Sequence, residues 1–120
     1  MTTLTFTIPA DTWLTHNGRL HWAVKAKRTK TLRALGHLKA REANLRDLGP
    51  TLVTAHIGYL TNGRVDPANC AVLKPLIDGM TDAGVWPDDD STHVIGPMPL
   101  RGPKSPTPGA YTVTLTLTPA

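Results

Sequence analysis

The residues with the clearest chemical potential are four aspartates in the second half of the chain. Asp66 follows a predicted strand, and Asp88, Asp89 and Asp90 follow the next predicted helix. A strand end and a helix–strand loop can meet at one edge of a sheet, where grouped carboxylates repel one another unless a cation separates them. Mg²⁺ prefers such oxygen ligands and, once bound, activates water for phosphodiester cleavage. The alternatives are that Asp66 caps a helix and that Asp88–Asp90 form a solvated turn.

Lys74 is the one basic residue in the acidic stretch between Asp66 and Asp90. A lysine beside a metal site can neutralise a phosphate in the transition state, so Lys74 is a candidate catalytic residue. The alternative is an ordinary surface lysine that pairs with Asp78, four residues later on the same helix.

A second group of candidate residues is basic. Residues 19–46 carry nine basic side chains against one acidic, whereas residues 66–90 carry six acidic side chains against one basic. A phosphate backbone requires positive charge, so one surface of the protein is predicted to hold a polyanion. The alternative is that both runs are solvated faces. The candidate phosphate contacts are Arg19, Lys25, Lys27, Arg28, Lys30 and Arg33.

Trp22 lies inside this basic stretch. An exposed tryptophan there could stack on an unpaired base. We expect it in the core, because a tryptophan in a small domain is usually largely buried.

Several other kinds of site are excluded or not expected. The single cysteine, Cys70, rules out a disulfide within the chain and favours a reducing, cytoplasmic setting. The five histidines lack zinc-ligand spacing, and no phosphate-cradling glycine loop is present. We expect no targeting signal, and we expect no membrane association because no apolar run of membrane-spanning length is found. No protein partner other than a second copy is predicted.

The elements that must position these residues follow from hydrophobic periodicity. Alternating apolar residues predict strands over 2–8, 51–61, 91–95 and 110–118. A leucine stripe predicts a helix over 20–48, and a second apolar face predicts a helix from Asp66 onward. Pro75 lies within that second helix, so it should kink near Ala71 or restart at Pro75. The proline-rich stretch 96–109 is predicted to be a loop.

The resulting order is β-α-β-α-β-β. We predict one domain over residues 1–120. Its fold class is α/β in the broad sense, an α+β two-layer arrangement in which two helices pack against a mixed sheet.

The segment 66–94 reads D-P-A-N-C-A-V-L-K-P-L-I-D-G-M-T-D-A-G-V-W-P-D-D-D-S-T-H-V. It resembles the signature of the RusA-like crossover-junction endodeoxyribonucleases, or Holliday-junction resolvases. In that signature an aspartate and an asparagine precede a helix with a lysine and an Asp-Gly/Ala-Leu/Met step, followed by A-G-V and a double aspartate. Residues 17–22, N-G-R-L-H-W, are similar to the family's loop and helix start.

This resemblance implies a RusA-like fold and a homodimer. It also implies a Mg²⁺-dependent resolvase, with Mn²⁺ as an acceptable substitute, that nicks opposed strands of a four-way junction. By position, Asp66, Lys74 and Asp89 match the catalytic residues. The implied metal ligands are Asp66, Asp88, Asp89 and Asp90, and Asn17 and Asn69 join the basic residues as implied DNA contacts. Two extra residues separate Lys74 from Asn69.

The chain departs from the family pattern at Ala68, where the family has a further catalytic aspartate. Either a metal ligand is lost, or Asp78, Asp88 or Asp90 replaces it. We expect an active enzyme, because the other carboxylates and Lys74 remain. One alternative is a weakened or inactive protein of the same fold that binds branched DNA. The other is a basic nucleic-acid module without affinity for divalent metals.

Overall fold

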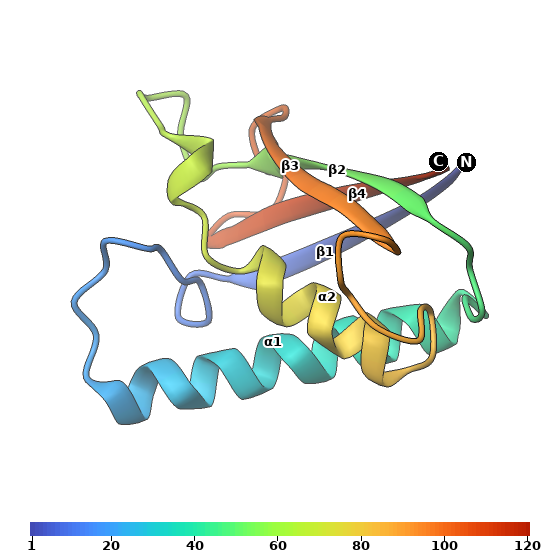
Figure 1. The fold of residues 1–120 in the computed structure, drawn as a ribbon. Helices are drawn as coiled ribbons and strands as arrows, with labels where there is room; N and C mark the ends of the chain where they lie inside the picture. Colours follow the sequence, from blue (N-terminus) through green and yellow to red (C-terminus); the bar gives the residue numbers. More distant parts are fainter.

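The computed structural model describes all 120 residues and contains two layers (Figure 1). One layer is a four-stranded sheet, and both helices lie on the same side of it. The elements, in chain order, are β1 (Thr2–Pro9), α1 (Trp22–Glu42), β2 (Thr51–Gly58), the 3₁₀ turn η1 (Pro67–Asn69), α2 (Leu73–Asp82), β3 (Val94–Arg101) and β4 (Ala110–Pro119). The predicted α+β class, the mixed sheet and the element order are therefore confirmed.

The strand order in the sheet is β1-β4-β2-β3. β4 pairs antiparallel with β1 on one side and with β2 on the other, and β2 pairs parallel with β3. A parallel pair needs a long crossover, and α2 provides it between β2 and β3. β3 lies at the edge of the sheet.

Alternation along the strands divides the sheet into a buried face and an open face. The inward side chains are buried, and they include Phe6 of β1, Ile57 of β2 and Leu115 of β4. All five residues of the predicted apolar face of the second helix are also buried: Val72, Leu73, Leu76, Ile77 and Met80. The open face carries threonines on β1 and β4. On β2 and β3 it carries the exposed apolar side chains Leu52, Ile95, Met98 and Leu100.

The two predicted helices are shorter than their patterns indicated. α1 ends at Glu42, and positive φ angles at Asn44 and Asp47 turn the chain away before Leu48. The second predicted helix is divided into η1 and α2, with the break at residues 70–72. Pro75 is the third residue of α2, in the first turn, where its missing N–H removes no intrahelical bond. Neither helix has the length and continuous apolar character that a membrane span requires.

The prediction for residues 91–109 is wrong in its boundaries. Instead of a strand over 91–95 and a long loop, β3 runs from Val94 to Arg101. The register against β2 shifts at Gly96–Pro97, which accommodates an extra residue as a bulge. Gly96 has φ +106°, and a Cβ there would lie 2.9 Å from the Met98 nitrogen and closer still to the Val53 carbonyl oxygen. Prolines are tolerated in this strand because it lies at the sheet edge.

The helices cross at two glycines. A Cβ on Gly79 of α2 would fall 2.8 Å from the backbone nitrogen of His37 in α1 and nearer still to the Arg33 carbonyl oxygen. A Cβ on Gly36 of α1 would meet the carbonyl carbon of Leu76 at 2.9 Å. Beside this crossing, the Arg33 guanidinium donates to both carboxylate oxygens of Asp82, at 2.6 and 2.8 Å. The packing face of α1 is Leu32, Gly36 and Ala40, whereas Leu38 of the predicted leucine stripe is exposed.

We predict that Gly79→Ala lowers the free energy of unfolding by about 1–3 kcal/mol or more, because the added methyl group meets backbone rather than a side chain that can move. Urea denaturation measures the change. Gly49→Ala is the matched control, since nothing lies within 4 Å of a Cβ at Gly49. The control should stay within about 0.5 kcal/mol of the parent. Equal stability of the two variants would contradict the close crossing.

Candidate active site

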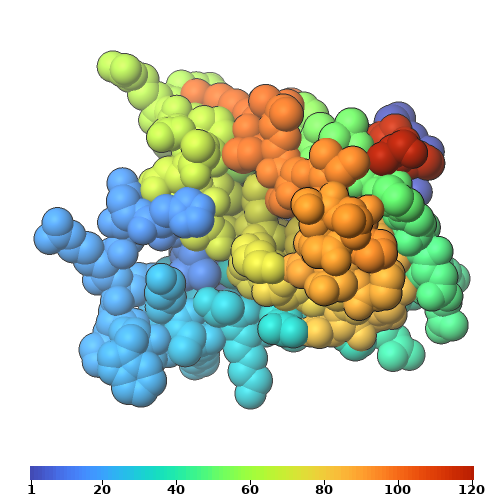
Figure 2. Space-filling model, viewed as in Figure 1, coloured from blue at the N-terminus to red at the C-terminus, as the bar shows by residue number.

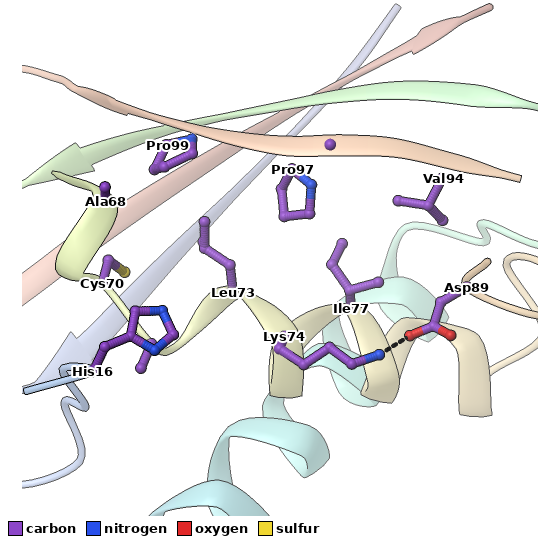
Figure 3. Close-up of a pocket in the computed structure, with 12 residues that line it drawn as sticks. His16, Ala68, Cys70, Leu73, Lys74, Ile77, Asp89, Val94, Pro97 and Pro99 are labelled. Carbon is purple, nitrogen blue, oxygen red and sulfur yellow. Dashed lines mark hydrogen bonds and ion pairs between the residues drawn. The ribbon is translucent and has the colours of Figure 1, made fainter. Parts of the chain in front are cut away.

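A cleft of about 380 Å³ lies between α2, β3 and the segment around η1. Figure 3 shows Lys74 and Ile77 projecting from α2, Pro97 and Pro99 from β3, and Ala68 and Cys70 from the η1 segment. Asp89 enters from the loop that connects α2 to β3, and His16 from the loop that follows β1. Two of the three predicted catalytic residues, Lys74 and Asp89, therefore line the same cleft.

Lys74 is held between two carboxylates. Its ammonium group donates to Asp89 in a direct ion pair and to Asp78 at 2.9 Å. The hydrogen bond from Lys74, followed by that involving Asp78, lowers the pKa of Asp89 to about 2. The hydrogen bonds that Lys74 donates, to Asp89 first and to Asp78 second, raise the pKa of Lys74. The predicted pairing of Lys74 with Asp78 is present, and the cleft holds an Asp78–Lys74–Asp89 triad.

The four aspartates predicted as metal ligands are not brought together. The Asp66 carboxylate caps η1 by accepting from the Ala68 backbone nitrogen at 3.1 Å, which is the capping role considered as its alternative. Asp88 accepts from the Asp89 backbone nitrogen at 2.7 Å. Asp90 contacts Thr92 and His93, and these hydrogen bonds, with Thr92 first, lower its pKa.

The structure contains no group of three or more histidine, cysteine, aspartate or glutamate side chains placed to hold one metal ion. The ammonium of Lys74 contacts the carboxylates of both Asp78 and Asp89. As they lie, these residues do not fit a divalent cation.

Ala68 occupies an informative position. It is exposed and lines the cleft together with Lys74 and Asp89. A carboxylate at residue 68 would therefore border the same cleft, and its absence leaves the triad as the charged part of the cleft wall.

The loop that carries His16 is tied firmly to η1. Thr15 forms an isolated β-bridge with Cys70, and the His16 nitrogen donates to the Asn69 carbonyl oxygen at 2.8 Å. The Asn69 side-chain amide donates to Asn17 Oδ1 at 2.9 Å, and Asn69 Oδ1 accepts from the Asn17 nitrogen at 3.1 Å. Asn17 and Asn69, predicted as DNA contacts, thus bind each other. Sequence spacing could not identify His16 as a cleft residue, because only this bridge brings it to the cleft.

Two side chains of the predicted basic surface make contacts within the fold. Arg28 donates to the Trp13 carbonyl oxygen at 2.9 Å, and Arg33 is paired with Asp82. Arg19, Lys25, Lys27 and Lys30 are exposed and make no ion pair. The expectation that Trp22 lies in the core is wrong, since the residue is 76% exposed at the start of α1.

Cys70 is not a candidate nucleophile. It is buried in the core, and burial raises the pKa of its thiol to about 11, so the thiolate is scarce at neutral pH.

Comparison with known proteins adds no assignment. No protein-family model matches the chain, and no curated protein matches it closely enough to count as a relative.

Proposed function

We propose that this protein is a structure-selective endonuclease that nicks branched DNA, with four-way junctions as its main substrate. The observation that carries this proposal is the convergence of the motif on one cleft. Ala68, Lys74 and Asp89 stand at the positions matched by the junction-resolvase signature, and all three line the same cavity although Asp89 follows Lys74 by 15 residues. Asp66 is adjacent, at the cap of η1.

The side chains of the cleft suit a phosphodiester substrate. Lys74 is 70% exposed at its side chain, so a phosphate oxygen can reach its ammonium group in exchange for Asp89 or Asp78. That exchange would neutralise charge on the scissile phosphate and leave carboxylates free beside it. The family resemblance implies a divalent metal, and the carboxylates could offer their oxygens to one only after Lys74 releases Asp78 and Asp89. The free protein has no assembled ligand set for it, so the roles assigned here are those of the side chains alone.

A second candidate function is binding of branched DNA without cleavage. Two observations favour it: Ala68 replaces a carboxylate at the cleft wall, and Lys74 is already neutralised by two aspartates. The two functions share the basic surface and differ only in whether the cleft is competent for hydrolysis.

We predict that Asp89→Asn and Asp66→Asn each reduce Mg²⁺-dependent nicking of a synthetic four-way junction by on the order of 100-fold or more. Junction affinity should stay equal or increase, because each change removes a negative charge near a polyanion. Asp47→Asn is the matched control: Asp47 is exposed and does not line the cleft.

Two outcomes would decide against the catalytic assignment. Normal nicking by Asp66→Asn would mean that this carboxylate only caps η1, because asparagine caps about as well. Normal nicking by Asp89→Asn would remove the cleft from the reaction. Ala68→Asp restores the missing carboxylate and should raise the nicking rate if residue 68 is what weakens the site.

We predict that replacing Lys25, Lys27 and Lys30 together by alanine weakens binding to duplex and junction DNA alike. The slope of log affinity against log salt should become shallower by about 0.9 for each phosphate that the variant no longer neutralises. The control is the triple alanine variant of Lys39, Arg41 and Arg46, which removes the same charge from the last turn of α1 and the loop that follows it. Equal effects of the two triple variants would mean that binding follows net charge rather than this surface.

The proposed enzyme is a homodimer, since two opposed nicks require two sites at a fixed separation. The open sheet face is the candidate interface, because its apolar side chains Leu52, Ile95, Met98 and Leu100 are exposed next to one another on β2 and β3. Sedimentation equilibrium should give a dimer for the parent chain and for the Leu38→Lys control. Met98→Lys with Leu100→Lys should give a monomer. A monomeric parent, with or without junction DNA, would contradict dimerisation.

A further inference from the structure

The first turn of α1 presents an exposed indole with no role in the fold. Trp22 is 76% exposed, whereas Trp13 and Trp86 are 7% and 1% exposed. Trp13 stacks on Tyr111 at 4.0 Å between ring centroids, and the Trp86 indole donates to Thr51 Oγ1 at 3.1 Å. The one aromatic neighbour of Trp22 is His21, which caps α1, at 5.5 Å. Trp22 therefore contributes little to the core, and its flat face is open to a ligand.

The surroundings of Trp22 are cationic and project from the body of the molecule. Figure 2 shows the segment around residues 20–25, in blue, projecting at the lower left. Arg19 and Lys25, three residues before and after Trp22, line a groove of about 240 Å³ together with Arg28. No acidic residue lies in the first turn of α1.

We propose that Trp22 is a stacking site for an unpaired nucleobase, with the Arg19–Lys25 groove holding the adjoining phosphate. Aromatic faces stack on bases of any sequence, and flanking cations hold the backbone, which is the usual construction of a single-strand binding site. This inference rests on the proposed function and extends it, because a base that opens at a branch point has no counterpart in a continuous duplex.

A lipid surface is the competing ligand for an exposed tryptophan among basic residues. An interfacial helix needs one apolar and one charged face. In α1, Lys25, Lys27, Arg28 and Lys30 are spread around the helix axis at 100° per residue rather than gathered on one face. The charge pattern therefore favours a nucleic acid, which can contact several sides of a projecting helix.

The test uses the intrinsic fluorescence of the full-length protein. Because the other two tryptophans are buried, acrylamide quenching reports mainly on Trp22. A twelve-residue oligothymidine and a four-way junction should each quench Trp22 and protect it from acrylamide, whereas a linear duplex should do neither. Trp22→Ala should weaken binding to the oligothymidine by about 5- to 100-fold. Its affinity for duplex should be unchanged, and Trp22→Phe should retain most single-strand affinity. Leu38→Ala, which truncates an exposed apolar residue at the other end of α1, is the control.

Each other result overturns the inference. Equal loss of duplex and single-strand affinity in Trp22→Ala would make Trp22 part of a general surface. Junction binding that leaves acrylamide quenching unchanged would remove Trp22 from the complex, while the proposed function would stand. Blue-shifted Trp22 emission with anionic phosphatidylserine vesicles, and not with oligothymidine, would assign it to a membrane. No binding to any DNA would overturn both proposals.

Discussion

The cleft depends on how closely α1 and α2 cross. Gly36 and Gly79 bring the two backbones to a separation that no other residue type allows, and the bidentate Arg33–Asp82 pair fixes the crossing at its edge. α2 is then held against the sheet by its buried apolar face, and its exposed face turns Lys74 toward the loop that carries Asp89. A wider crossing would shift Lys74 relative to Asp89 and β3, because α2 is nearly rigid over so short a length.

The bulged strand β3 forms the wall of the cleft opposite α2. Gly96 allows a backbone conformation that other residues rarely adopt, and Pro97 and Pro99 line the cleft from the same strand. The Asn17–Asn69 pair and the Thr15–Cys70 bridge fix the loop that precedes α1 to η1. The start of the basic helix is thereby connected to the cleft.

Sequence patterns predicted the parts of the fold in which one periodicity dominates. Threonines alternate with apolar residues in β1 and β4, and five apolar residues define the buried face of α2. The two strands and this helix face were therefore predicted correctly. The length of β3 was not predicted correctly, because Pro97 and Pro99 are typical of loops unless the strand is known to lie at a sheet edge.

At the candidate site, the sequence could not predict the tertiary contacts. The spacing of Lys74 and Asp78 predicted their pairing, but the addition of Asp89 depends on a loop whose path no pattern specifies. The sequence suggested that Asp66 and the run Asp88–Asp90 form one metal site, whereas Asp66, Asp88 and Asp90 each accept from local backbone or side-chain donors. Trp22 was expected in the core because burial is common for its type, and only the position of α1 at the edge of the molecule shows otherwise.

The activity proposed for the cleft is hydrolysis of a phosphodiester in branched DNA. The most direct measurement is incubation of the unmodified protein with a four-way junction labelled in turn on each strand, in Mg²⁺ and in excess EDTA. We predict paired nicks in opposed strands with Mg²⁺, none with EDTA, and none in a linear duplex of the same sequence. Tight junction binding without any nick under these conditions would contradict this activity, and would leave the protein as one that binds branched DNA without cutting it.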